Sequence, residues 1–218
     1  MSHIFLTPSW FYSYDAFFHI VCTAIALVLA IFSFKLFRLT DQRQAKLFGL
    51  SFLLISAAYF IKALFNFAII SVICQEGLSN LPLILSLDYW GTYLHNVVIL
   101  SGFLLLLYMT FCIENKHVLA AMISFALIAI AFSENPFAMF YLISTVCLLF
   151  ISWHFVKNYF RQRRALALIS ALAFISLMLG NAHFFISVSN ESAYVVGHLL
   201  ELLAYVLILI NFYMVFRK

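Results

Sequence analysis

Long apolar runs, separated by short polar stretches, limit what this chain can fold into. The runs are about 18 to 28 residues long, which suits α-helices crossing a hydrocarbon core of about 30 Å and exceeds the roughly 9 to 11 residues of a membrane barrel strand. Only 9% of the residues are charged, against about 25% in soluble domains, and the mean hydropathy is +1.09. The sequence therefore predicts an all-α integral membrane protein and excludes a soluble globular domain.

The apolar runs divide the chain into a regular series of helices. We place seven spans, at residues 15–37, 47–73, 88–112, 117–133, 137–160, 165–188 and 193–215. The predicted fold is a seven-transmembrane-helix bundle that forms a single domain at 15–218, preceded by an extracytoplasmic tail at 1–14.

The positions of the basic residues predict the orientation of the bundle. Eleven of the twelve Lys and Arg lie in alternate connections or after the last span: Lys35, Arg38, Arg43, Lys46, Lys116, Lys157, Arg161, Arg163, Arg164, Arg217 and Lys218. The positive-inside rule then gives an outer N-terminus and an inner C-terminus, in a multi-pass protein of the cell membrane. The net charge of +4 reflects this topology, and no basic face for nucleic acid is visible.

Four histidines lie at one depth in four different spans. Each of His19, His95, His183 and His198 is about four to seven residues from the outer end of its span, which is roughly 6 to 10 Å below the surface. Polar groups in lipid usually face the bundle interior and mark function, and imidazole binds zinc, copper, iron and haem iron. We predict that the four converge on a metal ion or a haem b. The alternative is that each makes a separate hydrogen bond between helices.

Further polar residues accompany the histidines. Asn96, Asn181 and Glu201 follow or precede a histidine by one to three residues and are candidates to orient the ligands. Lys62 and Glu201 are the full charges well inside the spans, at similar depth, and an ion pair between them is the economical arrangement. Asn66, one turn from Lys62, extends this candidate proton relay toward the histidines.

Two segments resemble a family of membrane sensors. "GHLLELLAY" at 197–205 is similar to the last helix of MASE-type membrane-associated sensor domains, and "FHIVCTAIALVLAIFSFKLFRLTDQRQAKLFGLSFLLISAAYF" at 18–60 is similar to their opening hairpin. Such domains are normally fused to a kinase or cyclase output. The resemblance implies a sensor that signals to a separate cytoplasmic or membrane partner through the basic inner face.

These observations lead to three hypotheses about function. The first is a membrane sensor or redox module that holds a metal ion or haem in the outer leaflet. The second is a zinc-dependent intramembrane lipid hydrolase, with three histidines as ligands and Glu201 or Asp88 as base, although the His-x-x-x-His pair of such enzymes is missing from the last span. The third is a small transporter that couples to protons through Lys62 and Glu201. The sequence leaves open whether the protein is an enzyme.

Overall fold

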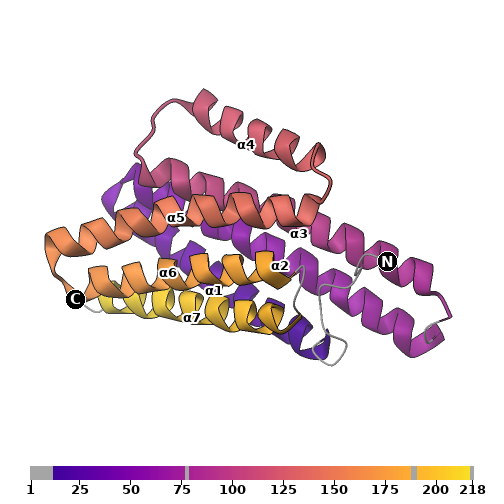
Figure 1. Ribbon diagram of the computed structural model, residues 1–218. Coiled ribbons are helices and arrows are strands. Elements are labelled where there is room, and N and C mark those ends of the chain that lie inside the picture. The colour runs from indigo at the N-terminus through magenta and orange to yellow at the C-terminus, as the bar shows by residue number, and fades with distance from the viewer. Residues whose placement is uncertain (1–11, 77–78, 188–190, 217–218) are drawn as a thin grey trace.

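The computed structural model describes residues 12–76, 79–187 and 191–216, and every regular element among them is an α-helix (Figure 1). The helices are α1 (Tyr12–Thr40), α2 (Arg43–Glu76), α3 (Leu81–Thr110), α4 (Lys116–Ala131), α5 (Pro136–Gln162), α6 (Ala165–Ser187) and α7 (Glu191–Phe216). The prediction of an all-helical bundle is confirmed. Most of the predicted N-terminal tail, 1–11, lies outside the described residues.

Six of the helices are long and apolar enough to cross a membrane, so the chain is a multi-pass membrane protein. The exception is α4, which has 16 residues and is therefore about 24 Å long, less than the thickness of a typical hydrocarbon core. The fourth predicted span thus exists as a helix that runs back along the outside of the bundle, and it is shorter than a regular crossing (Figure 1).

The helix ends follow local signals in the sequence. The side chain of Asn115 caps α4 by accepting from the backbone N–H of His117, and Asn135 caps α5 in the same way by accepting from Ala138. Pro136 occupies the first turn of α5, where its missing N–H costs nothing. The chain can therefore reverse within a few residues and keep neighbouring helices antiparallel.

The bundle consists of two three-helix units. In one, α1 packs on α2 and α2 on α3; in the other, α5 packs on α6 and α6 on α7. The units meet where α3 contacts α5 and α1 contacts α7, and we call this boundary the seam. α4 packs against α3 and α5 and lies to one side of both units (Figure 1). The interior of the seam is the part of the bundle that side chains from both units can reach.

The two ends of the bundle differ in charge. The connections α1–α2, α3–α4 and α5–α6 carry or adjoin the basic clusters, and we call this the basic end. The opposite end contains the connections α2–α3, α4–α5 and α6–α7. Fully buried apolar side chains fill the seam between the ends, among them Leu29, Phe52, Phe103 and Leu177. They separate a polar pocket near the opposite end from a cavity near the basic end.

Candidate metal centre

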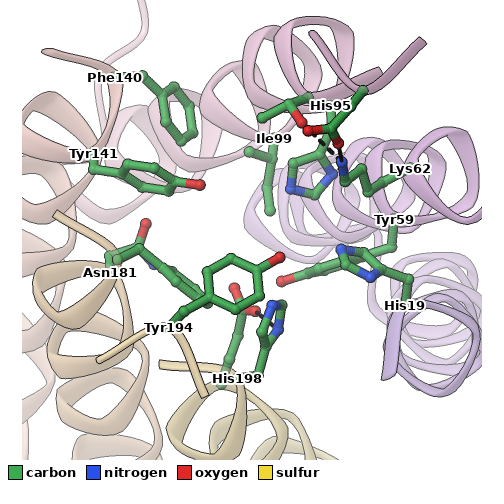
Figure 2. A pocket seen from close by; sticks show the side chains of 14 residues that line it. His19, Tyr59, Lys62, His95, Ile99, Phe140, Tyr141, Asn181, Tyr194 and His198 are labelled. Carbon is green, nitrogen blue, oxygen red and sulfur yellow. Dashed lines mark hydrogen bonds and ion pairs between the residues drawn. The ribbon is translucent and has the colours of Figure 1, made fainter. Parts of the chain in front are cut away.

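The polar pocket lies in the seam toward the opposite end and receives side chains from all six long helices (Figure 2). These include His19 from α1, Lys62 from α2, His95 from α3, Tyr141 from α5, Asn181 from α6 and His198 from α7. The volume open to water-sized molecules is about 30 Å³, which is room for about two waters. The pocket is therefore small, and its lining is unusually polar for the middle of an apolar bundle.

Three of the four predicted histidines come together in this pocket. The rings of His19 and His198 have centroids 5.4 Å apart, and those of His19 and His95 are 5.7 Å apart. His183 does not join them: it is absent from the pocket lining, and its Nδ1 donates to the Leu179 carbonyl oxygen of its own helix at 2.8 Å. The prediction of four converging imidazoles is thus wrong for His183, whose position on α6 lies off the face that meets the seam.

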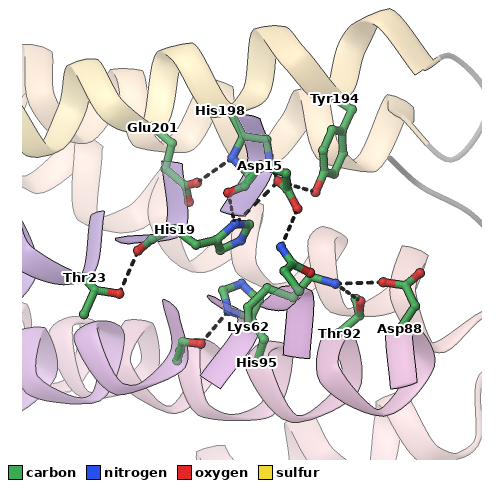
Figure 3. A network of polar contacts seen from close by, with 12 residues as sticks. Asp15, His19, Thr23, Lys62, Asp88, Thr92, His95, Tyr194, His198 and Glu201 are labelled. Atoms are coloured by element: carbon green, nitrogen blue, oxygen red, sulfur yellow. Dashed lines mark hydrogen bonds and ion pairs between the residues drawn. The ribbon is translucent and has the colours of Figure 1, made fainter. Parts of the chain in front are cut away.

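Asp15 connects the histidines to the rest of the network (Figure 3). Its side chain is 1% exposed. The Oδ1 atom accepts from the Tyr194 hydroxyl at 3.0 Å and lies 3.1 Å from Nε2 of His198. The Oδ2 atom accepts from the amide of Asn66 at 2.9 Å. One carboxylate therefore links α1 to α2 and across the seam to α7.

Two of the converging histidines, His19 and His95, are held by hydrogen bonds from their Nδ1 atoms. In His19 this atom donates to the backbone carbonyl of Asp15 at 2.6 Å, and in His95 it donates to the carbonyl of Ala58 at 3.0 Å. In His198 it lies 3.7 Å from Oε2 of Glu201. A partner on one ring nitrogen fixes the tautomer and orients the other nitrogen, as is usual for metal-binding histidines.

Asp15, His19 and His198 have the spacing of a metal site. One ligand atom from each lies within 4.8 Å of the other two, and all three residues are buried. Zinc bonds to nitrogen and oxygen ligands are about 2.0 to 2.2 Å long, so neighbouring ligand atoms in a tetrahedral site are roughly 3.3 to 3.5 Å apart. The 3.1 Å between Nε2 of His198 and Oδ1 of Asp15 is already close to that separation. Small side-chain shifts would complete the three-ligand arrangement.

Lys62 has a different partner from the predicted one. Its ammonium donates to Oδ1 of Asp88 at 2.9 Å and to the Thr92 hydroxyl at 2.8 Å, and it does not pair with Glu201. Asp88 and Thr92 are one turn apart on α3, so both face α2. Because α3 starts at Leu81, seven residues before the predicted span, Asp88 lies inside the bundle rather than at its rim. It is therefore the nearer acid to Lys62.

Glu201 and Tyr59 line the pocket side by side, and Tyr205 lies against Tyr59 outside the lining. The Glu201 carboxyl group interacts with the hydroxyl of Tyr59, which lies 3.0 Å from the hydroxyl of Tyr205. Both tyrosines are almost completely buried. Below them the seam is apolar, so this pair marks the limit of the polar network.

The three predicted asparagines have different environments. Asn66 belongs to the network through Asp15. Asn181 lines the pocket and donates to the Leu177 carbonyl of its own helix at 3.1 Å. Asn96 is buried outside the pocket lining, and neither end of its amide has a hydrogen-bond partner in the described part of the chain. The sequence therefore identified one network member, one lining residue and one isolated buried amide.

Close packing of α6 on α7 helps to position His198. A Cβ atom on Gly197 would lie 2.6 Å from the ring of Phe184, and one on Gly180 would lie 3.0 Å from the Gly197 carbonyl oxygen. Small residues let helices approach closely in lipid. The approach brings the Phe184 ring to 4.8 Å from the His198 ring, which limits the directions in which the imidazole can point.

Sequence reasoning missed Asp15 and Tyr194 as members of the site. Both lie at the outer ends of the predicted spans 15–37 and 193–215, where acids commonly face water and aromatic rings anchor the bilayer interface. One signal was present, because Asp15 precedes His19 by four residues and so shares its helix face. Tyr194 likewise precedes His198 by four residues on α7, and their ring centroids are 4.6 Å apart. The contact of Asp15 with His198, in contrast, depends on the pairing of α1 with α7, which no local pattern reveals.

The comparisons with known proteins add little about chemistry. Residues 137–218 match a family of unknown function, DUF5985. This match covers the unit of α5, α6 and α7, less than half of the chain, and includes His198 and Glu201 but none of the residues from α1 to α3. No curated protein and no solved structure matches the chain.

Proposed function

We propose that this protein is a membrane sensor or redox module that binds a divalent transition-metal ion in the outer leaflet and signals to a partner protein through its basic end. The observation that carries the proposal is the buried cluster of Asp15, His19 and His198, with a separate hydrogen-bond or ionic partner for each side chain. The accumulation of basic residues at the other end supports an outer N-terminus and an inner C-terminus.

The ligand set favours iron or zinc. Two imidazoles and one carboxylate are the ligands of non-haem Fe²⁺ centres and of zinc sites with an open coordination position. The volume of about 30 Å³ favours a single ion with one or two waters over a haem macrocycle. His95, whose ring lies 5.7 Å from that of His19, is available to a molecule bound at an open position of the metal.

A zinc-dependent lipid hydrolase is the second candidate. Three protein ligands and an open position are what a metal needs to activate water, and Glu201 lies 3.7 Å from a ligand histidine, where a carboxylate base is useful. Lipid hydrolysis that is lost with a chelator and restored by Zn²⁺ would favour this candidate over the sensor.

Elemental analysis of the detergent-purified protein tests the proposed centre. We expect about one equivalent of iron or zinc per chain, retained through dialysis and removed by a strong chelator. His198→Ala should lose the metal, because it deletes a ligand and the contact with Asp15.

His183→Ala is the matched control for this experiment. This variant also removes an imidazole, but from α6, the neighbour of α7. Among the described contacts, the His183 imidazole makes a hydrogen bond only to Leu179, one turn earlier in the same helix. We expect full metal content in this variant. Wild-type protein without stoichiometric metal after reconstitution with Fe²⁺ or Zn²⁺, or equal metal content in the two variants, would overturn the proposal.

A further inference from the structure

The seam is hollowed from both of its ends. A second cavity, which we call the basic-end cavity, has a volume open to water-sized molecules of about 260 Å³. Its mouth lies beside Gln42 and Gln44, both exposed at the basic end. Side chains from all six long helices line it, and the same six helices line the polar pocket at the opposite end. The two hollows therefore share one interface and open toward different ends of the bundle.

A thin closed layer separates the two hollows. On α7, Glu201 lines the pocket and Ile208 lines the cavity, and on α6 the same number of residues separates Asn181 from Phe174. Seven residues of helix span about 10 Å, which is about a third of a hydrocarbon core of roughly 30 Å. The layer contains one fully buried side chain from each long helix, namely Leu29, Phe52, Phe103, Leu148, Leu177 and Tyr205.

The packing order of the long helices repeats after three. α1, α2 and α3 pack in sequence, as do α5, α6 and α7, and the contact of α3 with α5 is matched by that of α7 with α1. α4 lies outside this ring and brings the chain back, so α1 and α5 both begin at the opposite end (Figure 1). Packing within each unit is denser than packing across the seam. Many transporters consist of two such parallel repeats, which rock against each other around a central site.

The proposed metal ligands come from both units. Asp15 and His19 belong to α1, whereas His198 belongs to α7. Across the seam, Nε2 of His198 lies 3.1 Å from Oδ1 of Asp15 (Figure 3). A movement of one unit against the other would separate these ligands and weaken the hold on the ion. Metal binding is therefore coupled to the relative position of the two units.

We propose that the divalent metal ion of the polar pocket is a transported ion, which the two units release through the basic-end cavity when they rock about the seam. The proposal rests on the proposed metal centre and adds transport to it. The ion binds between the units, the closed layer opens below it, and the ion reaches the basic end. The cavity has room for the ion with a shell of waters, so a charged lining is not needed there.

Zn²⁺ uptake into sealed vesicles tests this proposal on the full chain. The protein is reconstituted in liposomes that contain a zinc-sensitive dye, and Zn²⁺ is added outside. Ions that only bind to the protein do not reach the dye. We expect saturable uptake that protein-free liposomes lack. His198→Ala should lose this uptake, because it deletes a ligand, and His183→Ala should keep it.

Variants that fill the basic-end cavity test the exit. Ala45→Phe adds a ring at a buried lining position of α2, and Ile208→Phe adds one from α7. Both should lose uptake but keep about one zinc per chain, since the ligands lie at the opposite end. Ala57→Phe is the matched control, because it adds the same ring to an exposed position of α2. We expect wild-type uptake in this variant.

Three results would contradict the proposal in different ways. Wild-type protein that holds zinc but gives no uptake above that of empty liposomes would overturn transport and leave the metal centre standing. Absence of stoichiometric zinc would overturn the metal centre itself, and transport with it. Full uptake in Ala45→Phe and Ile208→Phe, with their zinc retained, would show that the ion does not leave through the basic-end cavity.

Discussion

The two cavities of the seam are built from the same six helices and have opposite chemistry. The pocket at the opposite end is lined by Lys62, Asp88 and Glu201, and its volume is about 30 Å³. Asp15 adjoins this lining through its hydrogen bond with Tyr194. The cavity at the basic end has no charged lining residue in the described part of the chain, and its volume is about 260 Å³. Directed hydrogen bonds and ion pairs draw side chains together across the seam, whereas phenylalanine rings pack on one another and leave space.

α7 shows how short the boundary between these environments is. Glu201 lines the polar pocket and Ile208 lines the apolar cavity, with Tyr205 between them. Seven residues correspond to about 10 Å along a helix. The change from a polar to an apolar lining thus occurs within two helical turns. Single-residue variants should show whether the charged side chains hold the polar pocket closed.

The largest change in stability is expected when the ion pair between Lys62 and Asp88 is broken. Lys62→Met leaves Asp88 buried without its counter-ion, and breaking a buried pair costs about 3 to 5 kcal/mol. The free energy of unfolding in detergent, from denaturant titration, measures this cost. Lys62→Met combined with Asp88→Leu should recover most of the loss, because no unpaired charge remains.

Lys46→Met is the control for this prediction, since Lys46 is exposed at the basic end. It should change the free energy of unfolding little. An unchanged stability in Lys62→Met would mean that the ion pair does not hold the pocket together, and the comparison of the two cavities would fail.

The next effect concerns the support of the metal centre. Asn66→Leu removes the amide that donates to Asp15, and loss of such a supporting contact lowers metal affinity by about 10- to 100-fold. Competition with a chelator of known affinity measures the change. Asn96→Leu is the matched control, because this buried amide lies outside the pocket lining. If the two variants bind the metal equally, Asp15 is not a ligand held by Asn66.

The protein should become more stable when Asn96 is replaced by an apolar residue. Neither end of the Asn96 amide has a partner among the described residues, and an unsatisfied buried polar group costs about 1 to 3 kcal/mol. We therefore expect Asn96→Leu to raise the free energy of unfolding by up to that amount. A loss of stability would show that the amide has a partner, such as an ordered water buried beside it.

The sequence predicted the helices well because their signals are local. Run length and hydropathy identify each apolar segment, and Pro136 and Asn135 mark a helix start within one turn. The main errors in the bounds came from charged residues. Two of the predicted spans begin at Asp15 and Asp88, although both residues lie within helices and face the bundle interior.

The site was harder to predict because it depends on which helices are neighbours. Their equal depth in the predicted spans identified His19, His95 and His198 as candidates. Depth does not tell which face of a helix a residue occupies, and His183 lies at the same depth on a face that does not line the pocket. The Lys62–Glu201 pair failed for the same reason, since Lys62 faces α3 and not α7. Distances across the seam follow from packing between units, which the hydropathy pattern does not encode.

The smallest effect is expected at the boundary between the two cavities. Tyr205→Phe removes one hydrogen bond but leaves Tyr59 in contact with Glu201, so it should cost about 0.5 to 1.5 kcal/mol in the free energy of unfolding. Tyr59→Phe should cost more, because the buried Tyr205 hydroxyl then loses its partner. The double variant should cost no more than Tyr59→Phe alone, since the unpaired hydroxyl has been removed. Additive costs in the double variant would mean that each tyrosine is stabilised separately, and the boundary would then be two independent contacts rather than one hydrogen-bonded pair.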